Sequence, residues 1–277
     1  MTRFYFTVHP GDMARGRLLP GSHIMLVASA CWDDQRRRFR IRRPPADHIA
    51  SIALDSGGFT ACRRWGQYPW THQQYIDFVR DTARDATLDF VAIMDYACER
   101  EVHRGIHATN RDRIHATLTN DLRLRDLAPD LPWLSVLQGN TLDERAYDLA
   151  RRRALDLLPT HHAGLGSICG RPATEAAAVL RWYAHQLPSV RYHAFGLDAR
   201  ALDNDSAYFA VASWDSYAWN WARGRKGADR PPHLLRRPGE TWSAHVARLA
   251  AEYQRVCIQP RLTRPRQLPL LEAACSS

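Results

Sequence analysis

Short apolar segments recur along the chain and alternate with longer segments whose apolar residues have helical spacing. The short segments are rich in branched and aromatic side chains, which is typical of buried β-strands. We predict eight strands, at Phe4–Val8, His23–Ala28, Ile49–Asp55, Leu88–Asp95, Trp133–Gln138, His162–Ile168, Tyr192–Gly196 and Tyr208–Asp215.

Helical periodicity occupies most of the intervals between these strands. In Thr71–Ala86 the apolar residues fall on one side of a helix, and Thr71 is suited to cap its N-terminus. Further helices are predicted at Asn110–Ala128, Leu142–Leu158, Thr174–Gln186 and Glu240–Val256. The basic segment Arg36–Pro45 indicates a surface loop rather than a crossover helix.

Alternation of strands and helices, with about eight strands, predicts an α/β fold, a closed (β/α)8 TIM barrel. The length of 277 residues is close to the ~250 that this barrel usually needs, and we find no internal repeat. We therefore predict a single barrel domain over residues 1–259. Residues 260–277 are rich in Pro and Arg, and we expect an extended or partly disordered C-terminal tail.

Composition and charge narrow the function classes. Hydrophobic residues make up 45% and charged residues 24%, as in ordinary globular proteins. No apolar run reaches the ~18 residues of a membrane span, and the N-terminus lacks a signal-peptide core, so we expect a cytoplasmic protein. The net charge is +9, carried almost entirely by arginine, since Lys226 is the only lysine. This balance favours a polyanionic partner such as nucleic acid or a nucleotide.

The cysteines show neither disulfide nor zinc-finger spacing, so we expect reduced thiols and no bound metal. They are Cys31, Cys62, Cys98, Cys169, Cys257 and Cys275.

Acidic and amide side chains stand at the predicted C-terminal ends of several strands. These are Asp55, Asp95, Gln138 and Asp215. Catalytic groups of a barrel gather at this end of the strands, and a carboxylate is costly to bury without a task or a partner. We therefore expect an active site at this end of the barrel.

The segment Asp55-Ser56-Gly57-Gly58-Phe59 joins an acid, two glycines and an aromatic ring. The glycines let the backbone approach a ligand closely, and the ring offers a flat apolar face. Together they could hold a planar base and act on the sugar bond beside it. The alternative is a strand that ends in an Asx turn.

Five elements, in order over roughly residues 50–225, resemble the tRNA-guanine transglycosylase superfamily. Leu54–Phe59 resembles its DSGGF/Y motif, and Gln138–Gly139 resembles its QGG element. Gly164–Ser167 and Phe195–Gly196 are similar to its GLAVGE and MGVG segments, and Asp215 stands where its nucleophilic aspartate follows the last strand. The chain is most similar to the DpdA-like branch, which inserts 7-deazaguanine bases into DNA. The short length and the pattern Asp215-Ser216-x-x-Trp219 favour that branch.

The chain departs from the superfamily pattern in two places. The tRNA enzymes carry a zinc subdomain with a CxCxxC…H pattern near the C-terminus, where this chain has only Cys257 and Cys275. We therefore expect a barrel without the zinc-binding subdomain, and a tRNA substrate is disfavoured because that subdomain helps to hold tRNA. The glutamate of GLAVGE is also missing, since Cys169 or Gly170 stands near its place, so recognition of the 7-substituent would differ.

The resemblance implies a role for each site residue. Asp215 would attack C1′ of the sugar, and Asp55 would move protons onto the leaving base and off the incoming one. Asp95 would accept hydrogen bonds from the N1–H and 2-amino edge of a guanine-like ring. The other predicted base-binding residues are Gln138, Gly139, Gly164, Leu165, Phe59, Phe195, Gly196 and Ser56.

Structural explanations stay open for three of these residues. Asp55 could cap the next helix, and Asp95 could pair with Arg100 or Arg104. Phe195 could belong to the barrel core.

The predicted activity is exchange of guanine in DNA for a 7-deazaguanine, such as 7-cyano-7-deazaguanine, through a covalent sugar–aspartate intermediate and without a cofactor. The partners would be DNA and a free 7-deazapurine base, and the target base would be turned out of the helix. Arg223, Arg225 and Lys226, with the run Arg36–Arg43, are the candidates to bind phosphates, although charge runs are often merely solvated.

Two other functions remain as alternatives. The first is base exchange or N-glycosidic hydrolysis on a free nucleoside or nucleotide. The second is a non-catalytic nucleic-acid-binding barrel. A homodimer and partner proteins of a DNA-modification system are also left open.

Overall fold

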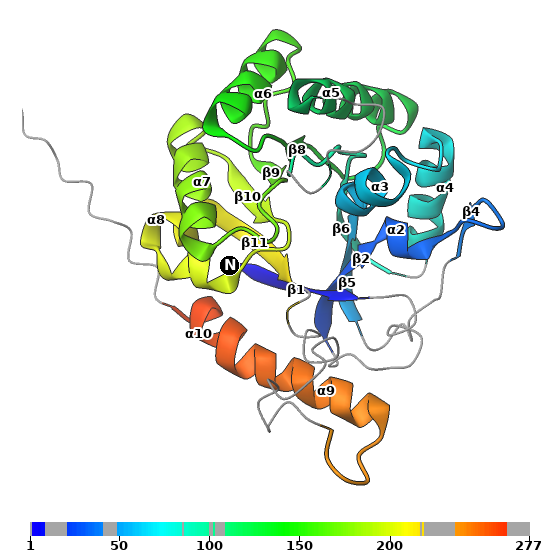
Figure 1. Ribbon diagram of the computed structural model, residues 1–277, viewed down its shortest axis with the longest axis vertical. Helices are drawn as coiled ribbons and strands as arrows, with labels where there is room; N and C mark the ends of the chain where they lie inside the picture. The colour runs from blue at the N-terminus through cyan, green and yellow to red at the C-terminus, as the bar shows by residue number, and fades with distance from the viewer. Residues whose placement is uncertain are drawn as a thin grey trace, which may run out of the picture.

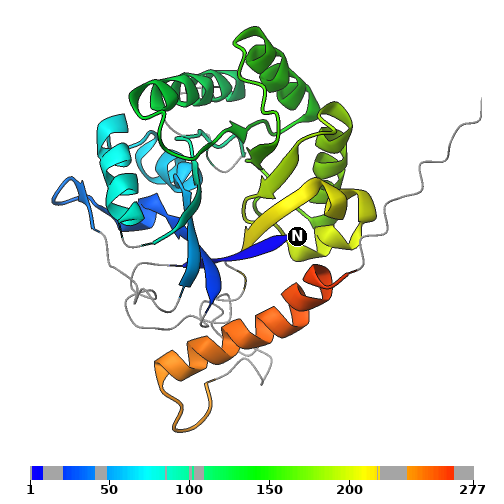
Figure 2. The same cartoon turned by 180° about the vertical axis from the view of Figure 1, so that it is seen from behind.

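The computed structural model describes residues 2–8, 21–40, 49–84, 86–99, 102, 109–216, 218 and 236–264. A parallel sheet curves around the centre of the molecule, and helices lie around its outside (Figures 1 and 2). Its strands are β1 (Arg3–Val8), β2 (Ser22–Val27), β5 (Ile49–Asp55), β6 (Leu88–Ala92), β7 (Trp133–Leu134), β8 (Val136–Leu137), β9 (His162–Leu165), β10 (Arg191–Ala194) and β11 (Val211–Ser216).

The sheet nearly closes because β7 and β8 are two halves of one extended segment, interrupted at Ser135. The strand order is β7-β6-β5-β2-β1-β11-β10-β9-β8, and all neighbours are parallel. The first half pairs with β6, where Val91 N donates to Pro132 O at 2.9 Å; the second pairs with β9, where Gly164 N donates to Ser135 O at 2.8 Å. The chain itself thus joins the two edges of the sheet. With β7 and β8 counted as one strand, the predicted eight-stranded barrel is confirmed.

The main helices also follow the prediction. They are α4 (His72–Ala83), α5 (Asn110–Leu127), α6 (Leu142–Ala154), α7 (Ala173–Gln186) and α9 (Trp242–Tyr253). Thr71 caps α4 as expected, because its hydroxyl accepts from Gln74 N while the Gln74 side chain accepts from Thr71 N. Such reciprocal caps also start α5 and α6.

Several short elements were not predicted. They are α2 (Ala28–Cys31), the hairpin of β3 (Trp32–Asp33) and β4 (Arg38–Phe39), α3 (Gly58–Trp65), the 3-10 helix η2 (Ala199–Asp203), α8 (Asp205–Ala210), the π-helical turn η5 (Gln254–Ile258) and α10 (Gln259–Leu262).

Two predicted segments need correction. The last strand was predicted from Tyr208, but Tyr208–Ala210 belong to α8, whose N-cap Asn204 accepts from Ala207 N at 3.1 Å. Tyr208 is buried in either conformation, so its apolar character does not distinguish the two. An extended tail from Pro260 is wrong for residues 260–262, which complete α10; residues 265–277 lie outside the described part, so the domain boundary at residue 259 stays a prediction.

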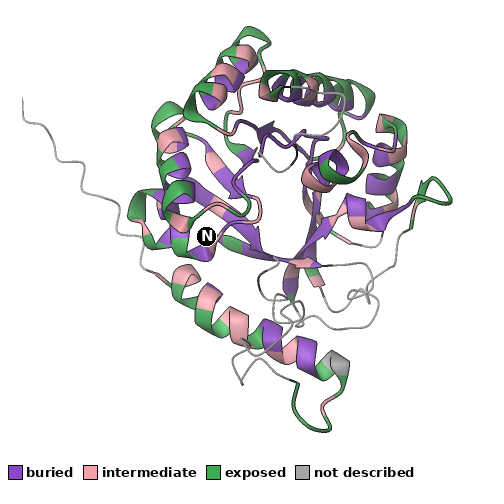
Figure 3. Cartoon of the chain, viewed as in Figure 1, coloured by how far each residue is buried: buried purple, intermediate pink, exposed green. Residues whose placement is uncertain are grey.

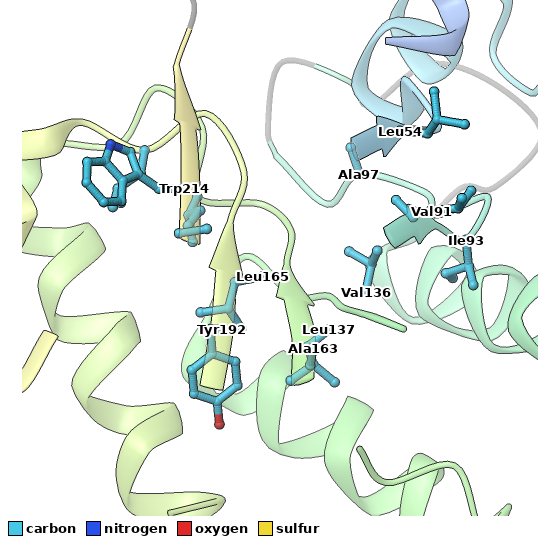
Figure 4. Packing of buried hydrophobic residues seen from close by; sticks show 14 of the residues in the cluster. Leu54, Val91, Ile93, Ala97, Val136, Leu137, Ala163, Leu165, Tyr192 and Trp214 are labelled. Atoms are coloured by element: carbon cyan, nitrogen blue, oxygen red, sulfur yellow. The ribbon is translucent and has the colours of Figure 1, made fainter. Parts of the chain in front are cut away.

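Most of the core lies between the strands and the surrounding helices. Figure 3 shows burial concentrated along the strands and on the inward faces of the helices, and Figure 4 shows part of this layer, including Leu165, Tyr192 and Trp214. Helix α9 covers β1, with the rings of Phe4 and Tyr253 6.1 Å apart. Inside the barrel, a smaller apolar cluster consists of Tyr5, Met25, Ala53, Phe90 and Leu134.

A polar cluster fills the N-terminal end of the barrel interior. Asp89 accepts from Tyr5 Oη at 2.8 Å and from the Ser51 hydroxyl, and it forms an ion pair with Arg3 at 2.8 Å. Because these contacts fill the N-terminal end, a ligand would be bound at the C-terminal ends of the strands. This end is called the mouth of the barrel below.

Within the described helices, no segment combines the length and the apolar character that crossing a membrane requires.

A fully buried ion network joins α5 and α6 to the interrupted strand. Arg152 forms ion pairs of 3.1 Å with both Asp121 and Asp148, and it donates to Val136 O at 2.7 Å. Asp148 in turn accepts from Gln138 N at 3.2 Å, directly after β8. The network therefore fixes the strand end that carries Gln138.

Replacement of Arg152 by leucine leaves two buried carboxylates without their shared cation. We expect Arg152→Leu to lower the free energy of unfolding by about 3–5 kcal/mol, the usual cost of breaking a buried ion pair. Urea unfolding followed by circular dichroism measures this. Arg153→Leu, at the exposed neighbouring position, should change stability by less than about 0.5 kcal/mol, and equal losses in both variants would contradict the proposed importance of the network.

Candidate active site

Three carboxylates lie together at the mouth. Asp55 is the last residue of β5, Asp95 lies in the segment after β6, and Asp215 is near the end of β11. Because the strands are parallel, these ends share one rim. The negative charges of Asp95 and Asp215 both act on the Asp55 carboxyl, so the three predicted acids are electrostatically coupled.

Asp55 is half-buried and titrates near neutral pH. Its Oδ1 accepts from Gly57 N at 2.9 Å, an Asx turn, while Gly57 itself is the N-cap of α3 at φ 77°. The alternative interpretation as an Asx turn is therefore correct for the backbone, and among the described residues only this one bond to the Asp55 carboxylate is found. Burial, followed by the charges of Asp95 and Asp215, raises the pKa of Asp55 to about 7. Such a group can both donate and accept a proton at physiological pH.

Asp95 is buried, and each of its carboxylate oxygens accepts one side-chain hydrogen bond. Ser56 Oγ donates to Oδ1 at 2.7 Å and Gln138 Nε2 donates to Oδ2 at 2.5 Å. Burial raises the pKa of Asp95 to about 6, against the effect of these bonds. The alternative partners Arg100 and Arg104 lie outside the described residues.

Gln138 is fully buried, and its amide orientation is fixed from both sides. Its Oε1 accepts from Ser167 Oγ at 2.6 Å, and Ser167 Oγ accepts from Cys98 N at 2.8 Å. With Oε1 used as an acceptor, Nε2 must be the group that faces Asp95. Ser167 was part of a recognised segment in the sequence but was not predicted to have this role.

Tyr68 is a second residue that the sequence analysis missed. Its hydroxyl donates to the main-chain O of Asp95 at 2.6 Å and lies 2.8 Å from Ser56 Oγ. It holds the Asp95 backbone while Ser56 holds the side chain. The tyrosine lies between two predicted elements, so no local pattern marked it.

Close packing explains two glycines at the site. A methyl group on Gly58 would lie 2.2 Å from Asp95 O, and one on Gly166 would lie 2.4 Å from Gln138 Nε2. Both positions therefore exclude a side chain, because the Asp95 main chain and the Gln138 side chain occupy the space.

Asp215 is buried and held by β1 and by the segment that follows β10. Thr7 Oγ1 of β1 donates to Oδ2 at 2.5 Å, and Gly196 N donates to Oδ1 at 2.8 Å. The Nε2 of His193 lies 3.3 Å from Oδ1, while its Nδ1 lies 2.8 Å from Ser213 Oγ. Burial lowers the pKa of His193, against the opposing effect of Asp215, and so favours the neutral ring. These contacts orient the carboxylate, and neither Thr7 nor His193 was predicted.

The predicted aromatic residues lie at the same end of the barrel. Phe195 is half-buried, with its ring 4.5 Å from that of His193, and it lies against Gly164, where a methyl group would be 2.5 Å from the ring. Phe195 also packs on the interior apolar cluster. Its position therefore agrees with both predictions, a residue of the core and a ring on which a base stacks. Phe59 is half-buried in the first turn of α3.

Other predicted residues contribute backbone or are not described. The Leu165 side chain is buried in the outer core, so only its peptide group is available, and its O accepts from Phe195 N at 3.4 Å. Gly139 has φ 139° and packs against Arg145. The predicted phosphate-binding residues Arg223, Arg225 and Lys226 lie outside the described residues.

Comparison with models of protein families finds a match over residues 21–236 to DpdA, described as DeoxyPurine in DNA protein A. The matched range includes Asp55, Asp95, Gln138 and Asp215. A search of curated proteins finds no match.

The raised pKa of Asp55 predicts a pH-dependent cost to stability. The native state holds this proton up to about pH 7, whereas the unfolded chain releases it near 3.8, so the wild-type protein loses stability as pH rises from about 4 to about 7. Asp55→Asn keeps an acceptor for Gly57 N and removes the charge. We expect the variant to be more stable than wild type by on the order of 2–4 kcal/mol at pH 8, with a smaller difference at pH 5.

Chemical denaturation at a series of pH values measures this difference. Asp126→Asn, which removes an exposed carboxylate, is the control and should show no such trend. A difference between Asp55→Asn and wild type that does not grow from pH 4 to pH 7 would contradict the raised pKa.

Proposed function

The chain belongs to the DpdA family, DeoxyPurine in DNA protein A, and we propose that it exchanges a guanine in DNA for a 7-deazaguanine base. Family membership implies a role in deoxypurine modification of DNA and confirms the resemblance found in the sequence. The observation that carries the proposed chemistry is the gathering of Asp55, Asp95 and Asp215 at one barrel mouth, each in a different hydrogen-bonding environment.

Base recognition falls to Asp95 and its neighbours. A guanine and a 7-deazaguanine present the same N1–H and 2-amino donors, and a carboxylate accepts both. Ser56 and Gln138 already orient the Asp95 oxygens, so little reorganisation is needed on binding. A 7-cyano-7-deazaguanine would be recognised by the same edge, with its substituent outside this contact.

In the first half of the exchange, an Asp215 oxygen attacks C1′ of the deoxyribose. The C1′–N9 bond breaks, and its electron pair leaves with guanine, which takes a proton from Asp55. The product is a sugar–aspartate ester, and Gly196 N would hold its carbonyl oxygen.

In the second half, the incoming deazaguanine gives its N9 proton to Asp55 and attacks C1′ from the opposite face. The bond between C1′ and Asp215 breaks, and the carboxylate is restored. Two inversions retain the configuration at C1′, and no electrons are gained or lost.

The direct test incubates duplex DNA, 7-cyano-7-deazaguanine and the protein, followed by digestion to nucleosides and mass spectrometry. We expect a modified deoxynucleoside from wild type, and a loss on the order of 10³-fold or more for Asp215→Asn, which lacks the nucleophile. Asp126→Asn is the matched control and should behave as wild type. Product from free nucleoside but not from DNA would favour the small-substrate alternative; no product from either, with DNA binding intact, would favour the non-catalytic barrel.

The two half-reactions should respond to pH in opposite directions. Formation of the covalent intermediate needs protonated Asp55 and should slow above about pH 7, whereas capture of the incoming base needs ionised Asp55 and should slow below about pH 7. Both should slow below about pH 6, where Asp95 is protonated. Rapid-quench denaturing gels of the protein–DNA adduct measure both rates, and a shared pH profile that Asp55→Asn leaves unchanged would remove Asp55 from proton transfer.

A further inference from the structure

An arginine-rich hairpin follows β2 and α2 and projects outward from the barrel beside α4. Strands β3 and β4 pair antiparallel, with Trp32 opposite Phe39 and Asp33 opposite Arg38. The hairpin follows β2 through α2, and Figure 1 shows β4 extending outward next to α4. Figure 3 shows its tip as exposed. The expected surface loop at residues 36–40 is thus an ordered hairpin.

Aromatic packing anchors this hairpin. The ring of Phe39 stacks on Phe78 of α4 at 4.4 Å and lies 5.0 Å from Trp70, while Trp32 lies 5.4 Å from Trp70. Trp70 also lies 5.2 Å from Tyr68, whose hydroxyl bonds to Asp95 O. Packed rings therefore connect the hairpin to Tyr68, and through its hydroxyl to the main chain of Asp95.

The hairpin and the end of α3 form one positively charged surface. Its arginines are Arg36, Arg37, Arg38 and Arg40 on the hairpin, with Arg63 and Arg64 in the last turn of α3. The two parts are joined by the 2.6 Å ion pair of Arg64 with Asp34. Asp33 and Asp34 are the only acidic residues in residues 28–40 and 58–74, so six positive charges face two negative ones.

Several of these arginines are held in place rather than merely solvated. Asp33 forms ion pairs with Arg36 at 3.2 Å and with Arg40. Arg37 lies over the Trp32 ring at 5.7 Å, and its main-chain O accepts from Gln74 Nε2 at 3.1 Å. Binding of an anion would therefore cost less side-chain entropy than on a flexible charge run.

We propose that this surface, called here the hairpin–α3 surface, binds phosphates of the DNA strand that flanks the target nucleotide. The inference rests on the proposed function. Helices α2 and α3 follow the C-terminal ends of β2 and β5, so the surface belongs to the same rim as Asp55. A base can reach the mouth only when its backbone crosses the rim, and a continuing strand then meets arginines that grip phosphate oxygens bidentately.

A strand of DNA fits this surface better than a free nucleotide does. The charges extend from the last turn of α3 to the projecting hairpin, whereas a mononucleotide has phosphates at only one end. The half-buried Trp65, with the guanidinium of Arg64 4.8 Å from its ring centre, adds an aromatic group of the kind that stacks on bases outside the helix.

The test compares two triple variants with the same loss of charge. Arg37→Ala/Arg38→Ala/Arg63→Ala removes three arginines of the surface, whereas the control removes the exposed Arg123, Arg153 and Arg181 of α5, α6 and α7. Binding of a fluorescent duplex DNA is measured by anisotropy over a range of NaCl concentrations. We expect the first variant to bind at least about 10-fold more weakly at low salt, with a log–log salt slope smaller by up to about 3, because each lost phosphate contact contributes about 0.9.

Unchanged affinity and slope in the first variant, or equal losses in both variants, would overturn the proposal. So would a loss confined to an RNA of the same sequence. Binding of free 7-cyano-7-deazaguanine should be the same in both variants, which shows that the barrel is intact. If the wild-type protein binds DNA through this surface in a salt-dependent way but exchanges no base, the proposed function is wrong and the proposal for the surface still holds.

Discussion

The buried carboxylate of Asp95 is the constraint on which the candidate site depends. A charge at this depth is tolerated only when both oxygens are hydrogen-bonded, and here Ser56 and Gln138 each supply one donor. Gln138 can do so because Ser167 occupies its carbonyl oxygen, and because Asp148 holds its main-chain N. The side chains that orient the Asp95 carboxylate and the contacts that fix the end of β8 thus belong to one hydrogen-bond network, and the proposed recognition of a base edge would depend on it.

The closeness of the three carboxylates lowers the stability of the fold but gives Asp55 a pKa suited to proton transfer. Asp55 lies close enough to Asp95 and Asp215 for their charges to raise its pKa, which weakens the native state above the pH at which the unfolded chain ionises. A carboxyl group that titrates near neutral pH is what the proposed base exchange would require. Asp55 is poised to gain and lose a proton, whereas Asp215 is oriented by Thr7 and Gly196. The three acids are chemically alike, and their surroundings differentiate them.

The packing outside the mouth extends this rigidity to the surface. The rings that begin at Tyr68, beside Asp95, continue through Trp70 to Trp32 and Phe39 on the hairpin. A rigid connection between a base pocket and a charged surface would keep the phosphate contacts at a fixed distance from the sugar that reacts. In the proposed reaction this spacing would matter, because a displaced strand would move C1′ away from Asp215.

The sequence by itself determined the barrel, its main helices and the acids at the strand ends. Strand length, helical periodicity and caps such as Thr71 are local properties, and parallel strands place Asp55, Asp95 and Asp215 on one rim whatever the details of packing. Only the tertiary structure decided which side chains meet there. Thr7 contacts Asp215 across 208 residues of chain, and Gln138 reaches Asp95 across 43, so no local pattern could reveal either pair. Helices α3 and α8 escaped prediction for a related reason. They are too short for helical periodicity to appear, and their burial against the barrel, rather than their own sequence, selects the conformation.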